Sequence, residues 1–176
     1  MNAPVKWIVI TLVAGAALAA APRWTAQTSG VAATLRGVSA VSDTVAWASG
    51  SGSTVLRTAD GGRTWQVLTV TTERLDFRDV DAIDARTAYV LSIGTGLASR
   101  IYKTTDAGAT WTLQYTNSDP QGFLDAMAFW DAAHGIVVGD SVDGAFSILL
   151  TVDGGRTWTP APAAGLPPAL AGEGVF

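Results

Sequence analysis

Cysteine is absent from the 176 residues of the chain. This absence excludes disulfides, thiolate metal sites, a cysteine nucleophile and a lipoprotein anchor. Charged residues are sparse as well, at 15%, and the acidic ones are in excess, which gives a formal net charge of −4. An acidic surface repels phosphate backbones and no basic run offers a local exception, so we expect no nucleic-acid partner.

A sustained helical period is also missing from every segment of the chain. Glycine is abundant instead, with 19 residues, and tryptophan is frequent, with 7. Sparse charge combined with many small and β-branched residues favours sheet over helix. The length alone favours a single domain.

The first residues have the pattern of a secretion signal. Lys6 supplies a positive charge, an uncharged apolar stretch runs from Trp7 to Ala20, and Ala17-Leu18-Ala19 is a small-x-small cleavage pattern. We therefore predict a signal peptide at residues 1–19, cleaved near Ala19, and a secreted or periplasmic protein. The alternative is a retained membrane anchor, although this stretch is shorter than the roughly 20 residues that span a bilayer. We expect no integral membrane segment in the mature chain, whose net charge would be −5 once Lys6 is lost.

The pattern Thr-x-Asp-x-Gly-x-Thr-Trp occurs three times, beginning at Thr58, Thr104 and Thr151. The aspartates of successive copies are 46 and 47 residues apart, and each copy holds four short β-type runs separated by turn residues. A period of about 40 to 50 residues with four strands is typical of a propeller blade. The sequence therefore predicts an all-β domain at residues 20–176, with four-stranded antiparallel β-propeller blades at about 31–70, 76–116 and 122–162.

Each residue type in this pattern has a structural task. The aspartate can accept hydrogen bonds from backbone amides of a tight turn, and the glycine can adopt a positive φ. The threonine and tryptophan should begin the fourth strand, with the indole packed between neighbouring sheets. The predicted structural residues are Asp60, Gly62, Thr64, Trp65, Asp106, Gly108, Thr110, Trp111, Asp153, Gly155, Thr157 and Trp158.

These three copies resemble the Asp box, or bacterial neuraminidase repeat. The longer pattern resembles the propeller family that includes photosystem II stability and assembly factors, and it covers about residues 24–160. The resemblance implies a β-propeller of six or seven blades. It does not imply an activity, because Asp boxes occur in sialidases, other glycosidases and non-enzymes alike.

Three blades are fewer than the four to eight of a closed propeller. The segment at 163–176 has the pattern of a further blade's first strand, which favours a fragment of a longer protein. The alternative is a half-propeller that dimerises.

Catalytic residues of the related enzymes are not evident in the chain. A sialidase would need an arginine triad and a Tyr–Glu pair, but the only glutamates are Glu73 and Glu173, and neither lies beside a tyrosine. His134 is the single histidine and is expected in a loop or at a strand edge. Asp140 and Asp143 are expected to serve turn chemistry rather than calcium binding. We predict no catalytic residue, metal or cofactor.

Four residues are candidates for partner binding. Arg36 and Arg78 occupy matching positions at the start of the first strands, and Asp79 matches Asp125. They could line a polar face that binds an anionic or peptide partner, or they could form Arg–Asp pairs that brace adjacent blades. The favoured interpretation is an exported, non-enzymatic binding or scaffolding propeller with a protein, small-molecule or glycan ligand. The alternative is an exported glycoside hydrolase whose catalytic residues lie mainly outside this chain.

Overall fold

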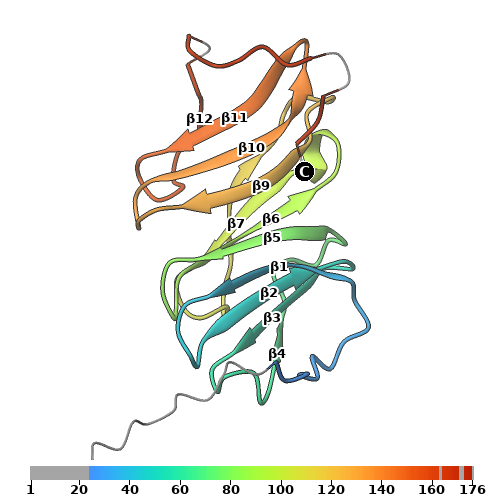
Figure 1. Ribbon diagram of the computed structural model, residues 1–176, viewed down its shortest axis with the longest axis vertical. Helices are drawn as coiled ribbons and strands as arrows, with labels where there is room; N and C mark the ends of the chain where they lie inside the picture. The colour runs from blue at the N-terminus through green and yellow to red at the C-terminus, as the bar shows by residue number, and fades with distance from the viewer. Residues whose placement is uncertain (1–23, 163, 171–172, 176) are drawn as a thin grey trace, which may run out of the picture.

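Strands account for almost all regular structure in the computed structural model, which describes residues 24–162, 164–170 and 173–175 (Figure 1). A single 3-10 turn, Gly96–Ala98, is the only helical element within these ranges. None of the described segments forms a helix that is long and apolar enough to cross a membrane. The predicted signal peptide, residues 1–19, lies outside the described part of the chain.

The strands form three four-stranded antiparallel sheets, each built from four consecutive strands. The first sheet contains β1 (Leu35–Ala40), β2 (Ala46–Gly50), β3 (Thr54–Thr58) and β4 (Gln66–Leu68). The second contains β5 (Asp76–Ala82), β6 (Ala88–Ile93), β7 (Arg100–Thr104) and β8 (Thr112–Thr116). The third contains β9 (Leu124–Phe129), β10 (Gly135–Val142), β11 (Ala145–Thr151) and β12 (Thr159–Pro160). The predicted fold class is confirmed.

The three sheets stack face to face, with their first strands side by side. Strand β5 contacts β1 and β2 of the first sheet, and β9 contacts β5 and β6 of the second. Figure 1 shows this succession as three layers along the long axis of the molecule. The strand that opens each sheet thus forms the inner edge of the stack. The turns of the three Thr-x-Asp-x-Gly-x-Thr-Trp segments, here called boxes, lie farther out between the third and fourth strands.

Two clusters of buried side chains hold the stack together. The first lies between the first and second sheets and includes Trp47, Val55 and Phe77, which are fully buried. The second lies between the second and third sheets and includes Tyr89 and Leu124. Each sheet interface therefore has its own apolar core, as expected for a stack of amphipathic sheets.

The inner strands share a bulge whose position corrects the repeat alignment. The pairing with the second strand shifts at Arg36 in β1 and at Arg78 in β5, so each arginine occupies a bulge. In β9 the shift falls between Leu124 and Ala126, which places Asp125 at the bulge. Asp125 is therefore equivalent to the two arginines and not to Asp79, because strand pairing sets the register.

The fourth strands begin later than expected. They start at Gln66, Thr112 and Thr159, one residue after each box tryptophan, so the threonine and tryptophan belong to the turn.

The C-terminal segment returns toward the third sheet. The amide of Ala169 donates to the carbonyl of Gly144, and the amide of Val175 donates to Asp140 Oδ1. No strand is assigned within residues 164–170 or 173–175, so the further blade at 163–176 stays a prediction.

Candidate functional site

The three boxes form the same hydrogen-bonded turn. In the first box, the Asp60 carboxylate accepts from the Thr64 amide at 3.0 Å and from the Thr64 hydroxyl at 2.7 Å. The Thr58 hydroxyl donates to Asp60 at 2.8 Å and accepts from the amide of Gly62 at 2.9 Å. The second and third boxes repeat these contacts with matching distances.

These hydrogen bonds account for the acidity of the box aspartates. The bonds from Thr64, Thr110 and Thr157 lower the pKa of Asp60, Asp106 and Asp153 to about 2, because they favour the charged carboxylate. Gly62, Gly108 and Gly155 have φ between 80° and 88°, in the left-handed region that favours glycine. A carboxylate that is fully engaged in its own turn is poorly suited to proton transfer or ligand binding.

The box tryptophans pack on the preceding sheet where one is present. The indole of Trp111 meets Trp47 of the first sheet edge to face at a centroid distance of 6.2 Å. The indole of Trp158 meets Phe129 of its own sheet at 5.8 Å, and both rings pack against the cluster that includes Tyr89 of the second sheet. Trp65 has no preceding sheet among the described residues, and its indole N–H donates to Gln27 Oε1 at 3.3 Å. The indole N–H groups of Trp111 and Trp158 have no acceptor among the described residues. Trp111 and Trp158 thus pack between sheets as expected, whereas the indole of Trp65 forms a hydrogen bond instead.

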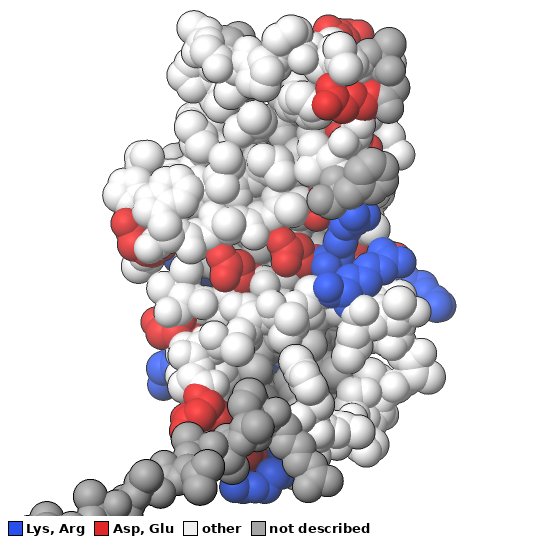
Figure 2. Space-filling view, viewed as in Figure 1, with Lys and Arg blue, Asp and Glu red and all other residues white. Residues whose placement is uncertain are grey.

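The four residues predicted to bind a partner lie together. Arg36, Arg78, Asp79 and Asp125, with Ala126, line an open hollow of about 530 Å³ at the inner edge of the stack. Figure 2 shows basic side chains gathered at one edge of the molecule, level with β5, with acidic side chains beside them. The hollow therefore combines residues from all three inner strands.

Ion pairs brace the sheets around this hollow. Arg36 pairs with Asp76 of the second sheet at 3.1 Å, and Arg78 pairs with Asp125 of the third sheet at 3.3 Å. The Asp79 carboxylate accepts from the amide of Met127 at 2.8 Å, which also joins the second sheet to the third. The bracing role is therefore present, while the arginine side chains remain 36% and 32% exposed.

Burial makes the two carboxyl groups of the hollow weaker acids. Burial, with a smaller contribution from the neighbouring Asp140, raises the pKa of Asp125 to about 6 against the opposing effect of Arg78. Burial likewise raises the pKa of Asp79, although hydrogen bonds from Met127 and Val80 act in the opposite direction. The Asp125 side chain is only 3% exposed, and its Oδ2 has no hydrogen-bond partner among the described residues.

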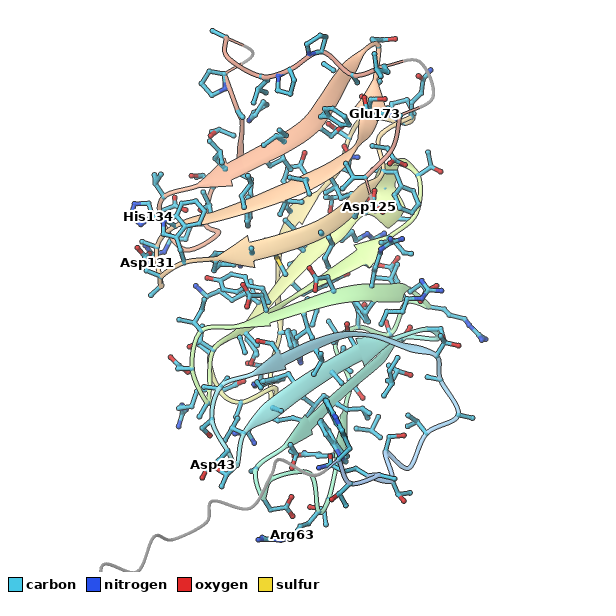
Figure 3. All side chains as sticks on the ribbon, viewed as in Figure 1. Asp43, Arg63, Asp125, Asp131, His134 and Glu173 are labelled. Atoms are coloured by element: carbon cyan, nitrogen blue, oxygen red, sulfur yellow. The ribbon has the colours of Figure 1, made fainter. Side chains whose placement is uncertain are left out.

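His134 lies at the opposite end of the third sheet. Its Nδ1 is 2.8 Å from Asp131 Oδ2, and Figure 3 shows both residues in the β9–β10 connection, far along the sheet from Asp125. Asp131 also accepts from the amides of Ala133 and His134, which is turn chemistry. His134 therefore has no part in the hollow.

No cluster of three potential metal ligands occurs among the described residues. Asp143 is at the tip of the β10–β11 hairpin with φ of 51°, a turn conformation.

Comparison with known proteins establishes the fold. No family model matches the chain, and a search of curated protein sequences finds no match. Among solved structures, YCF48 bound to D1 peptide matches with a TM-score of 0.59 and 20% identity, over 73% of this chain and 40% of that one. YCF48 from Cyanidioschyzon merolae matches with a TM-score of 0.57 and 20% identity, over 73% and 39% of the two chains.

Propeller enzymes match as well. An ancestral GH74 enzyme matches with a TM-score of 0.55 and 11% identity, over 72% of this chain and 18% of that one. The Niastella koreensis GH74 enzyme matches with a TM-score of 0.50 and 20% identity, over 68% and 20%. The chain thus spans about two fifths of the YCF48 structures and a fifth of the GH74 enzymes. Likeness at these identities concerns the fold, which binding proteins and enzymes share.

Proposed function

We propose that this chain is a non-enzymatic, exported β-propeller segment that binds a protein partner by holding an extended acidic peptide in the inner-edge hollow. The observation that carries the proposal is the convergence of Arg36 and Arg78 from two inner strands on one open hollow. Guanidinium groups that are one-third exposed can form bidentate hydrogen bonds with a carboxylate. The YCF48 structure with a bound D1 peptide supports a peptide as the class of ligand.

The two arginines are not equally available. The partner of Arg36, Asp76, is 37% exposed, whereas the partner of Arg78, Asp125, is 3% exposed. A ligand carboxylate can displace the exposed partner at small cost, because exposed ion pairs contribute about 0 to 1 kcal/mol. Displacing Asp125 would leave a buried carboxylate without its counter-ion. Arg36 is therefore the main ligand-binding cation, and Arg78 contributes chiefly to the potential of the hollow.

Fluorescence anisotropy with two labelled decapeptides, one rich in glutamate and one rich in lysine, tests this proposal. The glutamate peptide should bind and the lysine peptide should not, and binding should weaken as salt is raised. Arg36→Gln should weaken binding about tenfold, and Arg78→Gln about threefold, as expected for one lost charge-assisted hydrogen bond.

Arg63→Gln is the matched control. Arg63 is exposed at the first box, away from the hollow, so its replacement should leave the affinity unchanged (Figure 3). Equal effects of Arg63→Gln and Arg36→Gln would indicate non-specific attraction, and the hollow would not be the site.

A glycoside hydrolase is the second candidate, and the raised pKa of Asp125 favours it. A carboxyl group with a pKa of about 6 is the form that a general acid needs, and glycosidases pair such a group with a second carboxylate. The release of reducing ends from plant and bacterial polysaccharides would support this function if Asp125→Asn abolished it. Activity that persists in Asp125→Asn would exclude that residue as the acid.

Export has its own measurement. Mass spectrometry of the protein recovered from the periplasm or medium should find a chain that begins at Ala20, after cleavage at Ala19. Recovery of the intact chain in the membrane fraction would favour the anchor instead.

A further inference from the structure

The first and second sheets each contain a row of three side chains that runs across three neighbouring strands, and the two rows lie at the same register. Strand pairing places each member directly beside the next, on the face that meets the following sheet. In both sheets the row consists of a hydrogen-bond acceptor, an aromatic ring and a cation. The rows are Ser39, Trp47 and Arg57 in the first sheet, and Asp81, Tyr89 and Lys103 in the second.

In the first sheet, all three members contact the second. Ser39 Oγ accepts from the amide of Ala82 at 3.0 Å, and Trp47 packs edge to face on Trp111. Arg57 lies 5.3 Å from the centroid of Trp47 and donates to the carbonyl of Ala85 at 2.8 Å.

In the second sheet, the row repeats these tasks against the third. Asp81 accepts from the amide of Phe129 at 2.6 Å, and Tyr89 stacks on Phe129 with centroids 3.9 Å apart. The Tyr89 hydroxyl and Lys103 Nζ each donate to the carbonyl of Gly154 in the third box at 2.8 Å. The same three chemical groups thus join both pairs of sheets.

The third sheet has a different row at this register. Pairing in β9, β10 and β11 aligns Ala128, Ile136 and Leu150. None of these side chains can accept or donate a hydrogen bond, and none carries a ring or a charge. At this register, the outward face of the third sheet therefore lacks the acceptor, ring and cation found at the two internal interfaces.

The outward face of the first sheet is, by contrast, equipped to receive such a row. It exposes Val38 by 73% beside an apolar-walled hollow of about 330 Å³ that Trp65 also lines. Gly61 is the first-box equivalent of Gly154, and its carbonyl accepts from Gln27 Nε2 at 3.2 Å. Gln27 thus takes the place that Tyr89 and Lys103 take at the third box, and an incoming row would replace this exposed hydrogen bond.

We infer that the outward face of the first sheet is a docking surface for a further propeller blade that carries an acceptor–aromatic–cation row. The third sheet of a second copy, with its Ala–Ile–Leu row, is excluded from this surface. The chain therefore does not join head to tail with itself, although both outward faces are apolar. This inference concerns the sheet faces and is independent of the ligand of the inner-edge hollow.

Giving the third sheet the row of the second tests the inference. The variant Ala128→Asp/Ile136→Tyr/Leu150→Lys should self-associate, while the unaltered chain should keep the mass of one chain over a hundredfold range of concentration. Sedimentation velocity and light scattering measure the mass. Adding Val38→Lys to the triple variant should restore the single-chain mass, because it places a charge on the receiving face.

A control for added charge is Val152→Lys, at a position that is 70% exposed on the third box. This change should leave the association of the triple variant intact. Far-UV circular dichroism verifies the fold, and the variant Ala128→Asp/Ile136→Phe/Leu150→Lys, which keeps an aromatic ring without the hydroxyl, replaces the triple variant if that one is unfolded. Self-association of the unaltered chain that Val38→Lys abolishes would overturn the inference, and so would a folded row variant that stays a single chain.

Discussion

The indole of Trp111 provides the most direct test of how the sheets are held together. It is mostly buried against Trp47 and the first apolar cluster, with ring centroids 6.2 Å apart. Roughly 150 Å² of buried indole surface at about 25 cal/mol per Å² is worth about 4 kcal/mol. The remaining alanine methyl and relaxation of the site reduce the expected loss for Trp111→Ala to about 3 kcal/mol.

Trp65→Ala is the matched comparison, because Trp65 has the same place in the first box. It lacks a ring partner among the described residues, and its indole N–H contacts Gln27 of the N-terminal segment. We expect a loss of about 1 kcal/mol, since a segment that is not part of a sheet can move away with little loss of packing.

Urea unfolding followed by circular dichroism measures both free energies, with tryptophan-independent detection. The midpoint should fall clearly for Trp111→Ala and slightly for Trp65→Ala, with the slope unchanged. A loss below about 1 kcal/mol for Trp111→Ala, or equal losses for the two variants, would refute the packing role of the box tryptophan.

Three further outcomes follow from the same geometry. The box aspartates have pKa values lowered to about 2, so the stability they contribute is present above pH 3.8 and is lost as the pH falls toward 2; acid titration of the urea midpoint measures this loss. Asp125 has a pKa raised to about 6, so the stability that it contributes is fully present below pH 3.8 and is lost as the pH rises through 6. Asp125→Asn should remove this pH dependence of the urea midpoint. An unchanged pH dependence in the variant would assign it to another group. Gly108→Ala should lower the free energy of unfolding in urea by about 2 kcal/mol, because φ is +88° and the new Cβ would meet Leu68 at 2.5 Å. Gly144→Ala, with φ of +80° and open space around the new Cβ, should lower it by about 1 kcal/mol. Equal losses would mean that Leu68 moves aside.

The sequence predicted the turns of the three boxes because the residues that define each turn are close together in the chain. Aspartate, glycine and threonine act within seven residues of one another, so their spacing alone reports the turn. The sequence pattern did not predict the role of the Thr58 hydroxyl, which donates to Asp60 and accepts from the amide of Gly62. The recurrence of this threonine at the first position of all three boxes was the signal that could have identified its role.

The alignment of the third inner strand was wrong by one residue for a physical reason. Matching Asp125 to Asp79 is natural when letters are compared, but hydrogen bonding pairs Leu124 with Gly139 and leaves Asp125 in the bulge. A bulge is decided by the partner strand, which lies more than ten residues away. The composition of a single strand therefore cannot locate it.

The cross-strand rows were missed because their members are far apart and differ in type. Ser39 and Asp81, or Trp47 and Tyr89, share a task without sharing a letter, and each row joins residues from three strands. Only the register brings the acceptor, ring and cation together. Aligned repeats thus establish the turns of a propeller more readily than the faces that join its blades.

The existing ion pairs limit how tightly the inner-edge hollow can bind a ligand. Both of its arginines already contact carboxylates of the neighbouring sheet, so a ligand exchanges one anion for another rather than neutralising a free cation. The exposed Arg36–Asp76 pair contributes about 0 to 1 kcal/mol, so exchange of the anion at Arg36 by itself supports only weak, salt-sensitive binding. High affinity would require further contacts from residues next to the hollow along the inner edge, because linked contacts add without repeating the cost of association. A propeller that recognises an extended peptide tightly must therefore do so across several blades, with Arg36 as one contact among them.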